Sequence, residues 1–269
     1  MACVWMSEYD ARSWQAAYLI AFLLGDALWR WTVGVAGGAA ALQALMAACV
    51  LEESPRWLDS IHTKERRAGR ATALLACHWR EFTIASGLAL AHGATGANAV
   101  LYYSRDVLQR AGFSQPLALS LGVGFVKFLG ALTSICLVDQ QGRRPLLLGG
   151  TAIMCAGHVG LSLSFWALPT PGVLALGSLL LFIFAWNVSW AGLMLTVASE
   201  LLPQQVRGIG VGLIYALYWL LSFCISQTLE STLQSLGEGV TFAAFGAMTA
   251  VAFCFVWKYV PETNGVGLA

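Results

Sequence analysis

Seven apolar stretches, each long enough to cross a lipid bilayer, constrain the fold of this chain more than any other feature. They cover residues 29–51, 80–103, 116–138, 145–168, 173–201, 208–230 and 240–260. The hydrocarbon core of a bilayer requires about 20 apolar residues in an α-helix, because each spanning segment must satisfy its own backbone polar groups. The sequence therefore predicts an all-α integral membrane protein with several spans. A shorter apolar segment, residues 13–25, is expected to be a truncated span or an interfacial helix.

The composition agrees with a membrane protein and argues against several other classes. Only 11% of the residues are charged, whereas soluble domains average about 25%. The net charge of +1 and the lack of a basic face give no indication of a nucleic-acid partner. The seven cysteines include no CxxC pair, so we expect neither a metal site nor disulfides. Motifs such as GxSxG, HExxH or a phosphate-binding loop do not occur, and we predict no enzyme activity and no cofactor.

Basic residues are concentrated in alternate connections between the predicted spans. One set of connections contains the basic segment 52–79, the loop 139–144 and Arg207, whereas the opposite set has only Arg105 and Arg110. Cytoplasmic loops carry an excess of Lys and Arg. We therefore expect the first set of connections and the C-terminus to be cytoplasmic. Segment 52–79 is predicted to form cytoplasmic linker helices, with an irregular solvated connector as the alternative.

Polar residues within the predicted spans are candidates for a solute path. Lys127 lies at the midpoint of span 116–138, where a charged side chain costs about 2.5–3.5 kcal/mol on insertion scales. It is expected to line a polar cavity, and the alternatives are a structural ion pair or a local water defect. His158 stands alone on an apolar span and is interpreted as a packing residue. The pair Gly208 and Gly212, four residues apart, predicts a close approach between helices.

Span 80–103 contains a strip of polar residues: His92, Asn98, Tyr102 and Tyr103. The neighbouring glycines Gly93 and Gly96 predict that this helix is broken or bent. Broken helices near the membrane midplane are where transporters present amides and backbone groups to a solute. The Asn98 amide offers two donors and an acceptor, which suits a sugar hydroxyl. An interhelical hydrogen bond is the alternative role for Asn98.

Five segments resemble, in the same order, the signatures of sugar porters of the major facilitator superfamily, which include the facilitative glucose transporters. They are LEESPRWL (51–58), GATGANAVLYYSRDVLQRAGF (93–113), LVDQQGRRPLLLGG (137–150), SELLPQQVRGIG (199–210) and VPETNG (260–265). The resemblance implies the C-terminal six-helix bundle of that fold. The implied division is a helix-five remnant with helix six in 1–51, linker helices in 52–79, the bundle in 80–261 and a cytoplasmic tail in 262–269.

The resemblance also implies roles for individual residues. Asn98 and Trp219 would contact the sugar, with Lys127 and His92 at further substrate positions, and Tyr102 and Tyr103 would form a gate. A cytoplasmic charge network would consist of Asp139, Arg143, Arg144, Glu200, Arg207 and Glu262. In it Glu200 would pair with Arg207, and Arg143 and Arg144 would pair with carboxylates such as Glu200 or Asp139. The sequence departs from the family pattern at His92 and Gly93, which replace two glutamines, at 191–195, which lacks the usual prolines, and at Tyr218, which replaces an asparagine.

The implied function is alternating-access transport of a hexose or related polyol across the plasma membrane or an endomembrane. The expected partners are the solute, the lipid bilayer and a missing N-terminal half or another transporter subunit. The alternative is a non-transporting, truncated isoform or a degenerate half-transporter that acts only as a membrane interaction partner. A changed solute is a third reading, and Lys127 with His92 would then favour an anion.

Overall fold

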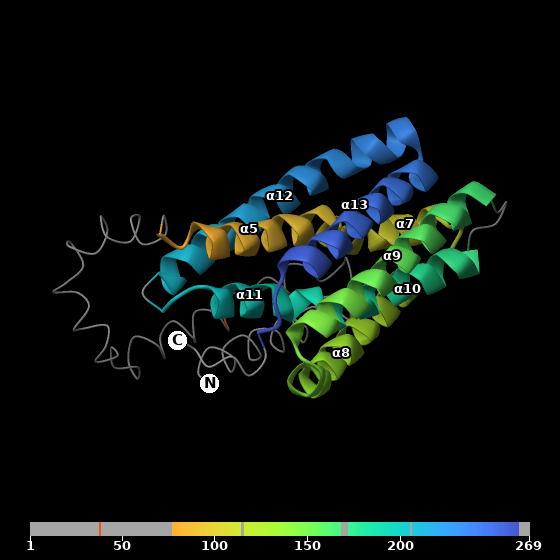
Figure 1. The fold of residues 1–269 in the computed structure, drawn as a ribbon. Helices are drawn as coiled ribbons and strands as arrows, with labels where there is room; N and C mark the ends of the chain where they lie inside the picture. Colours follow the sequence, from red (N-terminus) through yellow and green to blue (C-terminus); the bar gives the residue numbers. More distant parts are fainter. Residues whose placement is uncertain (1–37, 39–76, 114–115, 168–171, 205, 264–269) are drawn as a thin grey trace.

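The computed structural model describes residues 38, 77–113, 116–167, 172–204 and 206–263. Within these ranges every regular element is an α-helix, which confirms the predicted class (Figure 1). The helices are α5 (Trp79–Ala94), α6 (Ala97–Tyr102), α7 (Ser104–Arg110), α8 (Pro116–Gln141), α9 (Arg143–Ala167), α10 (Gly172–Val188), α11 (Trp190–Leu201), α12 (Arg207–Leu236) and α13 (Glu238–Tyr259). The predictions for residues 1–51, for nearly all of 52–79 and for the tail beyond residue 263 lie outside the described residues.

Helices long and apolar enough to cross a membrane account for most of the described chain. Five such stretches are Gly122–Gln141, Arg143–Trp166, Gly172–Leu201, Arg207–Leu236 and Glu238–Tyr259. Each overlaps one predicted span, and the chain is a multi-pass membrane protein. The predicted span 80–103 is instead divided between α5 and α6, neither of which is long enough alone.

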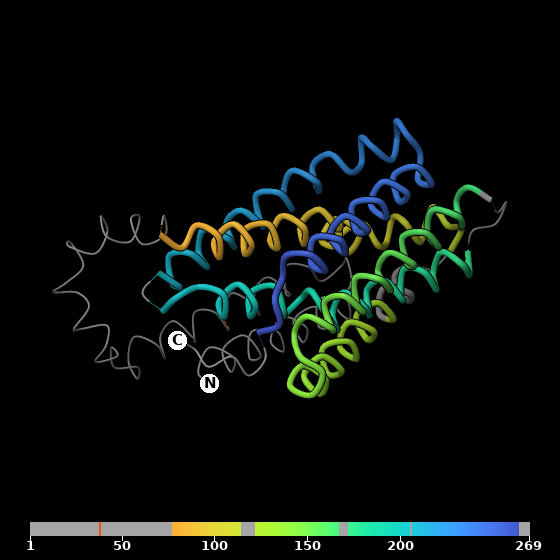
Figure 2. The backbone as a smooth tube through the Cα atoms, in the orientation of Figure 1, coloured from red at the N-terminus to blue at the C-terminus, as the bar shows by residue number. Residues whose placement is uncertain are grey.

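The bundle brings together helices that are far apart in the sequence (Figures 1 and 2). Helix α9 packs against α10 and α13, and α10 in turn packs against α8. Helix α5 lies beside α12 and α13 and also contacts α11. The short helix α6, which carries Asn98, contacts both α10 and α12. Polar residues on α5, α6, α10 and α12 can therefore meet inside the bundle.

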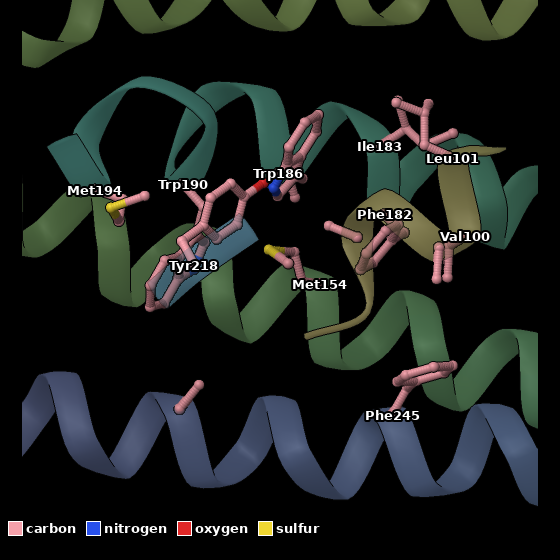
Figure 3. Close-up of a cluster of buried hydrophobic side chains, with 14 of the residues drawn as sticks. Val100, Leu101, Met154, Phe182, Ile183, Trp186, Trp190, Met194, Tyr218 and Phe245 are labelled. Carbon is pink, nitrogen blue, oxygen red and sulfur yellow. The ribbon is translucent and has the colours of Figure 1, made fainter. Parts of the chain in front are cut away.

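Apolar side chains lie on the outside of the bundle as well as in its core. Val173, Leu220, Val251 and Trp257 each expose between 62% and 84% of their surface. Removing an apolar side chain of this size from water stabilises a protein by about 1.5–3 kcal/mol. Leaving these side chains exposed to water would therefore be unfavourable. Such exposure suits contact with lipid. The interior is filled by large side chains such as Met154, Phe182 and Trp190 (Figure 3).

Glycines on α9 allow that helix to approach α10 closely. A Cβ atom on Gly150 would collide with the side chain of Ser189, and one on Gly157 would lie 2.8 Å from Cβ of Phe182. Small residues at such positions let helix backbones pack tightly in a membrane. The close approach predicted for Gly208 and Gly212 is wrong for the described residues, because neither position has an atom within 4 Å of a Cβ built there.

Candidate functional site

A break between α5 and α6 positions the candidate site. Helix α5 ends at Ala94, and Gly96 has a φ of +69° before α6 begins at Ala97. Glycine adopts this left-handed conformation at little cost, whereas other residues pay for it. A Cβ atom on Gly96 would also lie 2.5 Å from the ring of Phe245 on α13. The break therefore requires glycine for two reasons, and its position agrees with the one predicted from sequence.

Asn98 makes two hydrogen bonds across the bundle to α12. Its side chain is buried, and Nδ2 donates to Oη of Tyr218 at 2.6 Å and to Oγ of Ser222 at 3.2 Å. Tyr218 and Ser222 are four residues apart and so share one face of α12. These bonds use both N–H groups of the amide. In this state Asn98 has the interhelical role that was the alternative to ligand contact.

His92 lies at the centre of an aromatic cluster. The ring of Tyr218 stacks on it at a centroid distance of 4.6 Å, and the ring of Trp190 lies 5.5 Å away. Nε1 of Trp186 donates a hydrogen bond to Nε2 of His92 at 2.8 Å. An indole N–H only donates, so Nε2 must be the unprotonated nitrogen and the imidazole proton lies on Nδ1. Figure 3 shows the side chains of Trp186, Trp190 and Tyr218 close to one another.

Lys127 joins the same cluster from α8. Its side chain is buried, and Nζ lies 5.7 Å from the centroid of the Trp186 ring. The negative face of an indole attracts a cation placed over it. Trp186 therefore contacts Lys127 through its ring and His92 through its N–H. One tryptophan on α10 thus connects two predicted site residues that come from α8 and α5.

A cavity of about 480 Å³ lies beside this cluster. Its lining combines aromatic rings, hydroxyls, an amide and a carboxylate, from the residues Tyr102, Tyr103, Asp106, Trp219, Ser222, Phe223, Ser226 and Gln227. Trp219 exposes 43% of its surface, so its ring is available to a ligand. Ser222 belongs both to the cavity wall and to the hydrogen-bonded group of Asn98. The cavity and the buried cluster are therefore adjacent parts of one region.

The predicted charge network is built around Arg143 at the start of α9. The Arg143 guanidinium lies 3.4 Å from the carboxylate of Glu200 and 3.5 Å from that of Asp139. The Glu262 carboxylate accepts hydrogen bonds from the backbone N–H groups of Arg143 and Arg144, at 3.0 and 3.1 Å. The Thr263 hydroxyl donates to Glu200. The network therefore ties the segment after α13 to the facing ends of α9 and α11.

Two pairings expected in this network are wrong. Glu200 bonds with Arg143 and Thr263, whereas Nε of Arg207 donates to the carbonyl oxygen of Leu202 at 3.1 Å. The guanidinium of Arg144 donates to the carbonyl oxygen of Trp257 at 2.6 Å, so only its backbone reaches a carboxylate. The extended backbone at Leu202, which precedes a proline, ends α11 and turns that carbonyl toward Arg207.

Glu262→Gln is expected to lower the free energy of unfolding by about 1 kcal/mol, because the carboxylate caps the free N–H groups at the start of α9. Thermal unfolding of the purified protein in detergent measures this effect. Asp139→Asn is the matched control. Its carboxylate is 83% exposed, and we expect little change. Equal destabilisation by the two changes would contradict the capping role of Glu262.

A second ion-pair group lies at the opposite end of the bundle. The guanidinium of Arg110, the last residue of α7, binds Glu238 at 2.8 Å and Glu230 at 3.0 Å. The hydrogen bond to Glu238 raises the pKa of Arg110 above its usual value. This group joins α7 to the end of α12 and the start of α13. In the sequence, Arg110 entered only the comparison of basic residues between loops. Neither Glu230 nor Glu238 was predicted to be its partner.

Comparison with known proteins identifies the family. The family model described as "Sugar (and other) transporter" matches residues 72–269, which is well over half of the chain. The chain belongs to this sugar transporter family. The D-xylose-proton symporter of Escherichia coli K12 is 28% identical over 260 residues, covering 84% of this chain and 53% of that protein. The D-xylose-proton symporter-like 1 protein of Arabidopsis thaliana is 31% identical over 192 residues, covering 70% of this chain and 38% of that protein.

Solved structures of this sugar transporter family share the fold. A crystal structure of a D-xylose-proton symporter matches with a TM-score of 0.72 and 29% identity, over 92% of this chain and 60% of that one. The inward-open xylose transporter from Escherichia coli matches with a TM-score of 0.69 and 27% identity, over 93% and 60%. The major facilitator fold predicted from sequence is therefore confirmed. The chain spans about half the length of the curated relatives it matches.

Three residues that contribute to the candidate site of this sugar transporter family member were not predicted from the sequence. No role was predicted for Trp186 or Ser222, and Tyr218 was noted only as a departure from the family pattern. The available signal was the spacing of Tyr218 and Ser222, which places two hydroxyls on one face of an otherwise apolar helix. Trp186 gave no such signal, because only the fold places it between Lys127 and His92.

Proposed function

We propose that this chain forms the C-terminal bundle of a sugar transporter and that this bundle binds a hexose or related polyol. The observation that carries the proposal is the pairing of a buried amide on a broken helix with an adjacent aromatic and hydroxyl-lined cavity. A sugar has apolar C–H faces that suit the Trp219 ring and hydroxyls that suit amides and hydroxyls. Membership of the sugar transporter family supports the same solute class.

The proposed mechanism is alternating access around this region. Tyr102 and Tyr103, at the junction of α6 and α7, would close the cavity from one side as α6 moves about the break at Gly96. The Arg143 network would hold α8, α9 and α11 together at the other end in one state and release them in the other. The distribution of Lys and Arg supports a cytoplasmic position for the Arg143 end.

Reconstitution of the purified 269-residue chain in liposomes tests this function. Saturable uptake of D-glucose or D-xylose, with L-glucose excluded, is the expected result if the chain transports alone. A specific observation favours the alternative of a non-transporting interaction partner, since Tyr218 and Ser222 occupy both N–H groups of Asn98. Absence of stereoselective flux, with correct folding shown by a cooperative thermal transition, would overturn transport by this chain and support the alternative.

Lys127 bears on a separate question, namely whether the solute carries a charge. A buried ammonium beside the Asn98 and His92 cluster would favour a solute with a negative charge, such as a sugar acid. Competition of labelled D-glucose uptake by D-glucuronate and by D-glucosamine compares an anion with a cation of similar shape. Lys127→Asn is the matched variant, and loss of a glucuronate preference in it would assign the preference to this side chain.

A further inference from the structure

The carbonyl oxygen of Thr95 lies at the break, between the end of α5 at Ala94 and the start of α6 at Ala97. In an unbroken α-helix this oxygen would accept a hydrogen bond from the N–H of residue 99. At the break it instead lies 3.1 Å from Nε2 of His158, which reaches it from α9. Both residues are completely buried. A carbonyl only accepts, so Nε2 of His158 must carry a proton and donate it.

The His158 ring has little freedom to leave this position. The ring of Phe182, on α10, lies 4.4 Å away, and Phe245 and Phe242, on α13, stack on it at 5.8 and 6.5 Å. Helix α9 also packs closely against both α10 and α13. The donor is therefore held between aromatic side chains of the two helices that pack along α9. A donor that is positioned in this way can fix the place at which the helix breaks.

We infer that His158 is a positioning residue that anchors the break between α5 and α6 to α9. The hydrogen bond to Thr95 compensates the carbonyl that the break leaves without its helical partner, and so makes the bent form of the helix favourable. Asn98 lies three residues beyond Thr95, so the orientation of α6 and of its amide depends on the same anchor. The role in transport rests on the proposed function, whereas the anchoring of the break does not.

Substitutions at His158 separate the hydrogen bond from the packing. His158→Phe keeps an aromatic ring among the three phenylalanines but cannot donate to Thr95. His158→Gln places an amide N–H close to the position of Nε2 and should restore the bond. Ser162→Ala is the matched control, because Ser162 lies one turn further along α9 and donates from its buried hydroxyl to the carbonyl of Gly239, far from the break in sequence.

Hydrogen–deuterium exchange of the full chain in nanodiscs, without sugar, measures the anchor directly. We expect His158→Phe to speed exchange of the backbone amides in residues 96–100 about tenfold, the effect of losing one buried hydrogen bond. His158→Gln should exchange as the parent does, and Ser162→Ala should leave these amides unchanged. Unchanged exchange in His158→Phe, or equal acceleration in His158→Gln or Ser162→Ala, would overturn the inference.

A measurement on the unaltered chain covers the case in which His158→Phe does not fold. The ¹⁵N chemical shifts of a histidine ring report which nitrogen carries the proton. We expect a proton on Nε2 of His158, and a ring protonated only on Nδ1 would overturn the inference. Neither experiment requires sugar. Absence of transport by the chain would therefore overturn the proposed function and leave the anchoring role of His158 standing.

Discussion

Gly96→Ala is expected to lower the free energy of unfolding by about 2–5 kcal/mol, the sum of a strained left-handed residue and of overpacking in the core. The φ of +69° accounts for the first part, and the approach of the new Cβ to the Phe245 ring accounts for the second. Thermal unfolding of the purified chain in detergent, followed by loss of helical circular dichroism, measures the change.

Gly112→Ala separates these two contributions. Gly112 also has a positive φ, of +94°, but no atom of the described part of the chain lies within 4 Å of a Cβ built there. It should therefore show the conformational part alone, about 1–2 kcal/mol. Phe245→Leu, combined with Gly96→Ala, should recover part of the loss by removing the collision. If Gly96→Ala were no more destabilising than Gly112→Ala, the close packing of the break against α13 would be refuted.

Asn98→Ala is expected to weaken sugar binding by at least about tenfold, the cost of a lost hydrogen bond to a polar ligand. Isothermal titration of the purified chain with D-glucose and D-xylose measures the dissociation constant. The same change also leaves the hydroxyls of Tyr218 and Ser222 without the donor that they share in the free protein. Unfolding must therefore be measured beside binding, so that a loss of fold is not taken for a loss of contact.

Tyr218→Phe is the companion variant, and the expected change in affinity has the opposite sign. It keeps the ring that stacks on His92 and removes the hydroxyl that occupies one N–H of Asn98. That N–H then becomes available to a sugar, and binding should tighten. Equal weakening in Asn98→Ala and Tyr218→Phe would show that the pair has a structural role only.

Trp219→Ala should weaken binding without loosening the Asn98 bonds, because its ring lines the adjacent cavity.

Features of the fold that depend on one residue or one segment could be predicted from the sequence. The apolar stretches predict the helices, and Gly93 with Gly96 predicts the break, because a left-handed φ such as that of Gly96 is a local requirement of the backbone. The close approach of α9 to α10 was not predicted from the sequence. Gly150 indicates close packing only once its spatial neighbour Ser189 is known. Gly208 and Gly212 have the four-residue spacing that predicts close helix packing, but no atom of the described residues lies within 4 Å of a Cβ built on either.

Pairings between side chains were the least predictable part of the candidate site. Glu200 and Arg207 are close in sequence and opposite in charge, yet α11 ends between them and each finds another partner. The bonds from Asn98 to Tyr218 and Ser222 join residues more than 100 positions apart. Such contacts depend on how the helices cross, which side-chain type and spacing do not specify. The roles of Asn98, Lys127 and Trp219 toward a solute remain predictions.

Charged groups fasten α13 at its two ends, while apolar contacts hold it along its length. Glu238, its first residue, binds Arg110, and Glu262, just beyond its last residue, caps α9. Between these points it packs against α9 and α5. Salt screens partly exposed ion pairs far more than it affects buried apolar contacts. Raising the ionic strength should therefore loosen the two ends of this helix and leave its middle packed. The ends of α13 would then separate from their neighbours before the whole bundle unfolds.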